Sequence, residues 1–88
     1  MTDIKYAACC LAFNSDGQVL MVTRPKTEDQ YGLPGGKVNR NETPQQAALR
    51  ELQEETGYIG NNPTLIFADW CRGEDEYYTF TYLVNLID

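Results

Sequence analysis

Three glutamates in the middle of the chain have a spacing that suits a metal ion. Glu51, Glu54 and Glu55 lie at positions i, i+3 and i+4, so an α-helix would place their carboxylates on one patch of its surface. Like charges at this spacing destabilise a helix by about 0.2 to 0.5 kcal/mol per pair. Clustered carboxylates suit a hard divalent cation such as Mg²⁺ or Mn²⁺. The pattern therefore indicates a metal site, with a solvated helix face as the alternative.

The residues around this patch could orient the glutamates and admit a ligand. Arg50 lies four residues before Glu54, which allows it to hold that carboxylate in one orientation. Gly35 and Gly36 let the backbone approach a ligand closely, and a carbonyl oxygen of either residue could complete the coordination of a metal. A simple turn is the alternative for the two glycines.

Basic and aromatic residues elsewhere are candidates for contacts with a substrate. Lys37, beside the glycines, and Arg24, at the end of a predicted strand, could contact phosphates, with ordinary surface charge as the alternative. Trp70, Tyr77 and Tyr78 could stack on a nucleobase, although packing in the core or at a sheet edge is the commoner role of such rings.

The glutamates need a helix, and the sequence predicts where it begins and ends. Thr43 is a suitable N-cap, Pro44 suits the first helical position, and Gln46 completes a capping box. Gly57 is placed to end the helix.

Strands are predicted on both sides of this helix. Apolar or alternating segments predict four of them, at 4–13, 19–24, 64–70 and 77–87. A turn at 14–17 would join the first two in a hairpin. Residues 25–30 are predicted to form a loop, and three glycines and a proline in 31–36 argue against any regular element there. The order strand, strand, helix, strand, strand predicts the α/β (α+β) class.

Composition limits the kinds of function. The chain has 88 residues and a formal net charge of −6, which fits one small domain and argues against polymeric nucleic acid as a partner. Histidine is absent, so Ser-His-Asp and Cys-His mechanisms are excluded. The sequence has no membrane-spanning apolar run and no secretion signal, so we expect no membrane partner and a cytoplasmic location.

Several of these residues together resemble the signature of the Nudix hydrolase family. The matching positions are Gly36, Glu42 and the run Arg50-Glu51-Leu52-Gln53-Glu54-Glu55-Thr56-Gly57, entered through Leu33-Pro34-Gly35-Gly36. Tyr58 departs from the bulky aliphatic residue that ends the signature. The resemblance implies an α/β/α sandwich with a mixed sheet and one loop–helix–loop. It also implies Mg²⁺-dependent hydrolysis of a pyrophosphate bond in a nucleoside diphosphate linked to another moiety.

The resemblance also implies roles for individual residues. Metal ligands would be Glu51, Glu54, Glu55 and the carbonyl of Gly35, and either Glu51 or Glu54 would deprotonate or orient the attacking water. Arg50 would orient the glutamates and Glu42 would help to hold the loop. For the substrate we expect a small nucleotide, a nucleoside triphosphate or a related compound.

Domains of this family are usually longer than this chain. We therefore expect 1–88 to be a single Nudix-like domain that lacks the C-terminal strands and helix of the family fold. A non-catalytic nucleotide-binding module and an inactive fragment both remain as alternatives. The strand at 77–87 is expected to present an uncovered face or edge, through which the chain could form a homo-oligomer.

Overall fold

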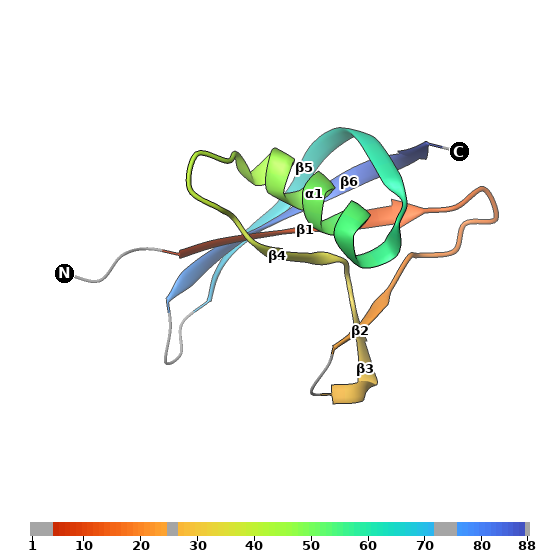
Figure 1. Ribbon diagram of the computed structural model, residues 1–88, viewed down its shortest axis with the longest axis horizontal. Coiled ribbons are helices and arrows are strands. Elements are labelled where there is room, and N and C mark those ends of the chain that lie inside the picture. Colours follow the sequence, from red (N-terminus) through yellow and green to blue (C-terminus); the bar gives the residue numbers. More distant parts are fainter. Residues whose placement is uncertain (1–4, 25–26, 72–75, 88) are drawn as a thin grey trace.

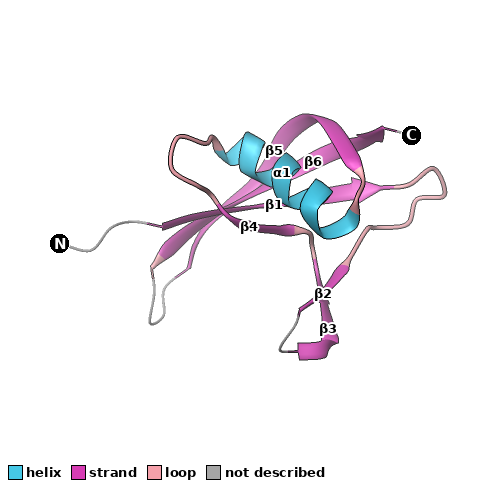
Figure 2. Cartoon of the chain, viewed as in Figure 1, coloured by secondary structure: helices cyan, strands magenta, loops and turns pink. Residues whose placement is uncertain are grey.

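A four-stranded mixed sheet with one helix on one face forms the body of the molecule (Figures 1 and 2). The computed structural model describes residues 5–24, 27–71 and 76–87. Its elements are β1 (Lys5–Phe13), β2 (Val22–Arg24), β3 (Thr27–Gly32), β4 (Gly35–Lys37), α1 (Pro44–Thr56), β5 (Ile59–Cys71) and β6 (Tyr77–Ile87). The sheet has the order β4-β1-β6-β5, with β1 and β6 parallel and the outer pairs antiparallel. Strands β2 and β3 form a separate sheet. The predicted mixed α/β organisation is confirmed.

The core lies between α1 and one face of this sheet. Alternation along β6 buries Tyr82 and Val84 and leaves Leu83 between them exposed, as the sequence predicts for this strand. Small residues on β1, among them Ala8 and Cys10, are buried in the same cluster, which lets the helix approach the sheet closely. Leu52 of α1 is fully buried against them. Burial of such a side chain stabilises the fold by about 1.5 to 3 kcal/mol.

The other face of the sheet has no helix over it in the described parts of the chain. Large side chains there, such as Phe67 and Leu83, are 57% and 39% exposed. The expectation of an exposed edge at 77–87 is wrong, because β6 lies between β1 and β5. The edge strands are β4 and β5. Among the described residues, no helix combines the length and hydropathy that a membrane span requires.

Two segments predicted to be irregular contain strands. Residues 27–32 form β3, with Tyr31 paired to Thr23 of β2, and Gly35–Lys37 form β4, with Gly35 paired to Cys9. Residues 25 and 26 of the predicted loop lie outside the described residues. Glycine weakens a strand, and for that reason the sequence argued against a regular element at 31–36. At Gly35, however, the strand requires a glycine. A Cβ on Gly35 would collide with the backbone of β1 at the Ala8 carbonyl.

Two strand boundaries also differ from the prediction. Where a hairpin was predicted around the turn at 14–17, the structure has one β-bridge, between Phe13 and Val19. Strand β2 begins later, at Val22. Strand β5 begins at Ile59, five residues before the predicted start at 64. Its pairing shifts between Asn61 and Thr64. The Asn-Asn-Pro segment is therefore a β-bulge inside a longer strand, not a loop.

Candidate active site between helix α1 and strand β4

The ends of α1 hold the helix in a defined position relative to the loop before it. The Thr43 hydroxyl accepts a hydrogen bond from the Gln46 amide at 3.1 Å, and the Gln46 side-chain oxygen accepts one from the Thr43 amide at 2.9 Å. Gly57 ends the helix in the left-handed conformation, with φ of 80°. The predicted capping box and C-cap are confirmed, and they account for 13 residues of helix from Pro44 to Thr56.

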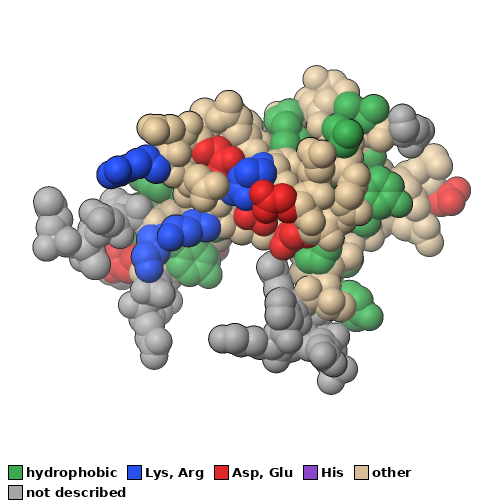
Figure 3. Space-filling view, viewed as in Figure 1, with side chains coloured by type: hydrophobic (Ala, Val, Ile, Leu, Met, Phe, Trp, Pro, Cys, Tyr) green, Lys and Arg blue, Asp and Glu red, His purple; other side chains and the backbone are tan. Residues whose placement is uncertain are grey.

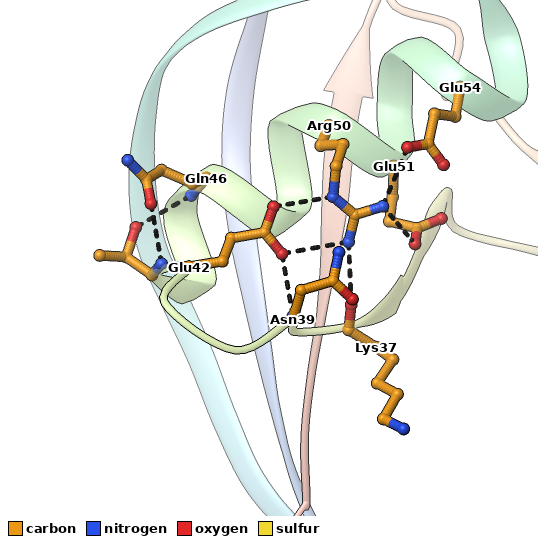
Figure 4. Close-up of polar contacts among 8 residues, drawn as sticks. Lys37, Asn39, Glu42, Gln46, Arg50, Glu51 and Glu54 are labelled. Atoms are coloured by element: carbon orange, nitrogen blue, oxygen red, sulfur yellow. Dashed lines mark hydrogen bonds and ion pairs between the residues drawn. The ribbon is translucent and has the colours of Figure 1, made fainter.

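One arginine joins the loop and the helix (Figure 4). Arg50 Nε and Nη2 donate to the two carboxylate oxygens of Glu42 at 2.7 and 3.1 Å, and Nη2 also donates to the Lys37 carbonyl at 3.0 Å. Its Nη1 donates to Glu51 Oε1 and Glu54 Oε1, each at 3.0 Å. A guanidinium has five N–H groups, so every one of them has an acceptor. We call Arg50 and these four acceptor residues the arginine clamp.

The clamp shifts the pKa values of its central pair. Hydrogen bonds from Arg50 and from the Asn39 amide hold the pKa of the Glu42 carboxyl below its usual range. The hydrogen bonds that Arg50 donates to Glu42, Glu54 and Glu51 raise its pKa above the ordinary value. Both groups are therefore charged at neutral pH. The bidentate pair ties the loop at Glu42 to the second turn of the helix.

Two glutamates lie against the glycine pair of β4. Glu55 Oε1 accepts a hydrogen bond from the Gly35 amide at 2.7 Å. A Cβ built on Gly36 would lie 2.7 Å from Glu51 Oε1 and 3.0 Å from Oε2, so the Glu51 carboxylate occupies the space that any side chain at 36 would need. Glu54 is more open than Glu51, with 57% of its side chain exposed against 17%.

This arrangement bears on metal binding in two ways. Carboxylate and backbone carbonyl oxygens lie around Gly35 and Gly36. Oxygen ligands of these kinds are the ones that a hard divalent cation requires. In the described residues, however, no group of three or more Asp, Glu, Cys or His side chains is arranged to hold a metal ion. In the structure Arg50 donates hydrogen bonds to Glu51 and Glu54, and the Gly35 amide donates one to Glu55.

The structure brings together most of the residues that the sequence singled out. Acidic side chains gather around a basic one on the face of the molecule that carries the helix (Figure 3). Arg50 forms ion pairs with Glu42, Glu51 and Glu54. Lys37 joins the clamp through its carbonyl, while its exposed side chain points away from Arg50 (Figure 4). Arg24 lies apart, in β2 of the small sheet, and its side chain lies outside the described part of the structure.

Some contributors could not be recognised from the sequence. The Lys37 carbonyl and the Asn39 amide act through the backbone, so their residue types carry no signal.

The fold and this loop–helix arrangement define the class to which the protein belongs. Its fold matches that of a MutT NUDIX hydrolase from Burkholderia pseudomallei with a TM-score of 0.82, over 99% of this chain and 71% of that one, at 23% identity. A MutT/nudix family protein from Enterococcus faecalis gives a TM-score of 0.80 over 99% and 40% of the chains, at 26% identity. The family model of the NUDIX domain matches residues 3–87. The chain therefore belongs to the NUDIX family.

Curated relatives differ in what they act on. The chain is 40% identical over 80 residues to an 8-oxo-dGTP diphosphatase of Haemophilus influenzae. The matched region covers 82% of this chain and 56% of the relative. It is 38% identical over 65 residues to an ADP-ribose pyrophosphatase of Bacillus subtilis. That matched region covers 70% of this chain and 35% of the relative. The chain thus spans about half or less of the length of these relatives.

Proposed function

We propose that this protein is a pyrophosphohydrolase that cleaves the pyrophosphate bond of a nucleoside diphosphate linked to another moiety. The observation that carries the proposal is the contact of two helix carboxylates, from Glu51 and Glu55, with the backbone of Gly35 and Gly36. Membership of the NUDIX family and the diphosphatase and pyrophosphatase names of its relatives support it. Among small nucleotides we favour a nucleoside triphosphate or a related compound, and we expect the protein to act in the cytoplasm.

Magnesium, or manganese in its place, is the cofactor we propose. Its ligands would be Glu51, Glu54, Glu55 and the carbonyl oxygen of Gly35, an all-oxygen set of the kind that hard cations prefer. Bound there, the metal would polarise a phosphoryl oxygen and neutralise charge on the leaving phosphate.

Residues of the chain itself would orient the glutamates, accept a proton from water and bind the substrate phosphates. Arg50 keeps the Glu51 and Glu54 carboxylates oriented, because it donates a hydrogen bond to each. Glu54, the more exposed of the two, is the better placed to take a proton from an attacking water. Glu51 is the alternative base, and Gly36 leaves room for its carboxylate. The exposed ammonium of Lys37 is available to a substrate phosphate, and we assign the same role to Arg24.

The test is Mg²⁺-dependent release of nucleoside monophosphate from a panel of nucleoside triphosphates, ADP-ribose and dinucleoside polyphosphates. Glu54→Gln should lower kcat by about 10²- to 10⁴-fold, the range for loss of a general base, with an unchanged circular dichroism spectrum. Asp16→Asn is the matched control, because it removes one acidic charge in an exposed turn away from the site. Nucleotide binding by calorimetry without any Mg²⁺-dependent product would overturn the proposal in favour of a non-catalytic binding module. An absent cooperative melting transition would instead indicate an inactive fragment.

A further inference from the structure

The proposed metal ligands come from two separate elements. Gly35 belongs to strand β4, whereas Glu51, Glu54 and Glu55 belong to helix α1. Both elements contact strand β1, which lies beneath the helix and pairs with β4 (Figure 1). Mg²⁺ requires its ligands at about 2.0 to 2.1 Å in a nearly octahedral arrangement. The separation between β4 and α1 must therefore be held closely if the two elements are to share one metal ion.

One residue of β1 is hydrogen-bonded to both sides of this site. The amide of Cys10 donates to the carbonyl oxygen of Pro34 at 2.9 Å, and its thiol donates to the carbonyl oxygen of Ala48 at 3.1 Å. Pro34 immediately precedes Gly35, the first residue of β4, and Ala48 lies in the second turn of α1. Cys10 thus links the entry to β4 with the helix through two atoms of a single residue.

The bond to the helix lies on the face that carries two of the carboxylates. Positions 48, 51 and 55 are spaced by three and four residues, so they share one face of α1. Glu51 lies against Gly36 on this face. Glu55 accepts a hydrogen bond from the Gly35 amide at 2.7 Å. A shift of the helix at Ala48 would therefore move both carboxylates relative to β4.

The surroundings of Cys10 leave its side chain little freedom. Its exposed fraction is 0%, and the core cluster to which it belongs also contains Ala48 and Leu52. Burial raises the pKa of the thiol to about 12, so the sulfur keeps its proton and donates it to the carbonyl. A carbonyl oxygen has two lone pairs, which allows the Ala48 carbonyl to accept from the thiol and from a helix amide together.

We infer that Cys10 is a positioning residue for the proposed reaction, whose amide and thiol hold β4 and the carboxylates of Glu51 and Glu55 at the separation that a shared metal ion needs. The inference rests on the proposed function, because the metal ion and its ligands belong to that proposal. Cys10 itself would touch neither the metal nor the substrate. Loss of a residue that orients metal ligands from outside costs about 10- to 100-fold in metal affinity. For the loss of one thiol we expect the lower end of this range.

Two substitutions separate positioning from packing. Cys10→Ala removes the donor, whereas Cys10→Ser retains a shorter one. Calorimetry with Mn²⁺ should show an affinity about tenfold lower in Cys10→Ala and an intermediate value in Cys10→Ser, and kcat should follow the same order. Stability should not follow it, because a buried hydroxyl with a stretched hydrogen bond is costly. The free energy of unfolding of Cys10→Ser, measured by urea denaturation, should be no higher than that of Cys10→Ala.

The matched control is Cys9→Ala. Cys9 is the adjacent residue of the same type, and alternation along β1 places its side chain on the other face of the sheet. Its thiol lies 3.3 Å from the Thr81 hydroxyl of β6 and makes no contact of this kind with the helix. Cys9→Ala should therefore bind Mn²⁺ as the wild-type protein does.

An infrared measurement keeps Cys10 in place and decides the question even if neither variant at this position folds. The chain has three cysteines, so the double variant Cys9→Ala, Cys71→Ala leaves Cys10 as its only thiol. Coupling between two sites is reciprocal, so a bond that strengthens metal binding must itself be strengthened when the metal binds. The S–H stretching band should move to lower frequency on addition of Mn²⁺. An unchanged band at saturating Mn²⁺ would overturn the inference.

The outcomes distinguish failure of this inference from failure of the proposed function. Wild-type Mn²⁺ affinity in Cys10→Ala, or an affinity that follows stability across the two variants, would also overturn the positioning role. Both results leave hydrolysis by the wild-type protein untouched. Conversely, Mn²⁺ affinity that depends on Cys10, in a protein that releases no product, would support the positioning role while removing the proposed enzymatic activity. A wild-type protein that binds no Mn²⁺ would overturn the inference together with the proposed metal site.

Discussion

The two faces of the sheet are built from different kinds of contact. On the face that helix α1 covers, the arginine clamp joins residues close in sequence, since Glu42 and Glu54 lie eight before and four after Arg50. On the other face, strands far apart in the chain meet, with Ala7 opposite Thr79. The clamp is charged and fully hydrogen-bonded, whereas the open face exposes large apolar side chains such as Phe67 and Leu83. This difference predicts that the two faces can be altered separately by mutation.

Gly36→Ala should give the largest separation of the two regions. The added methyl would lie 2.7 Å from Glu51 Oε1, so the Glu51 carboxylate must move. We expect kcat to fall about 100-fold, since misplacement of a reacting group by about 1 Å costs that much. The open face of the sheet should be unaffected, because the methyl points toward the helix. Steady-state kinetics check this, and an unchanged kcat would contradict the close contact between Gly36 and Glu51.

Arg50→Lys tests whether the clamp depends on the shape of the guanidinium. An ammonium retains the charge but cannot donate in a bidentate fashion to Glu42 while also reaching the Lys37 carbonyl. We expect a loss of about 1 to 2 kcal/mol in the free energy of unfolding, measured by urea denaturation. Lys37→Met is the control, because only the backbone of Lys37 belongs to the clamp. Equal stability of wild type and Arg50→Lys would contradict the role given to the fork geometry.

The pH dependence of stability should report on the clamp. Hydrogen bonds from Arg50 and Asn39 lower the pKa of Glu42 in the folded state. The stabilisation by Glu42 is therefore complete above its unfolded pKa of about 4.3 and is lost as the pH falls through the lower, folded pKa. Melting temperatures measured between pH 7 and pH 3 should fall more steeply for wild type than for Glu42→Gln. Parallel curves would contradict this linkage.

The smallest effect concerns the edge strand β5, where we propose pairing with a second copy of the chain. Ile59–Cys71 carries one charged residue, Asp69, and its Leu65, Ile66 and Phe67 are about half exposed. Antiparallel pairing of two such edges would satisfy their backbone groups without charge repulsion. Light scattering after size exclusion should show a concentration-dependent dimer that Ile66→Lys removes. A monomer at all concentrations would refute the pairing, and Ile66→Lys should leave the clamp unaffected.

Local patterns in the sequence predicted the helix and its surroundings well. Thr43, Gln46 and Gly57 gave the helix ends, because caps depend on residues three or four positions apart. The pairing of Arg50 with Glu54 was predicted from the same spacing. Predictions failed where pairing with distant strands decided the structure: the glycines of β4 form a strand against β1, and Asn62 lies in a bulge of β5.

By itself, the sequence determined a capped helix that presents three glutamates and an arginine at defined spacing, because helical contacts join residues three or four positions apart. Only the tertiary structure decided what these residues face. It placed Gly36 against Glu51, put β6 between β1 and β5, and packed Tyr78 on Trp70. The physical reason is strand register. A shift of one residue reverses the face of every side chain, and register is set by partners some 70 residues away.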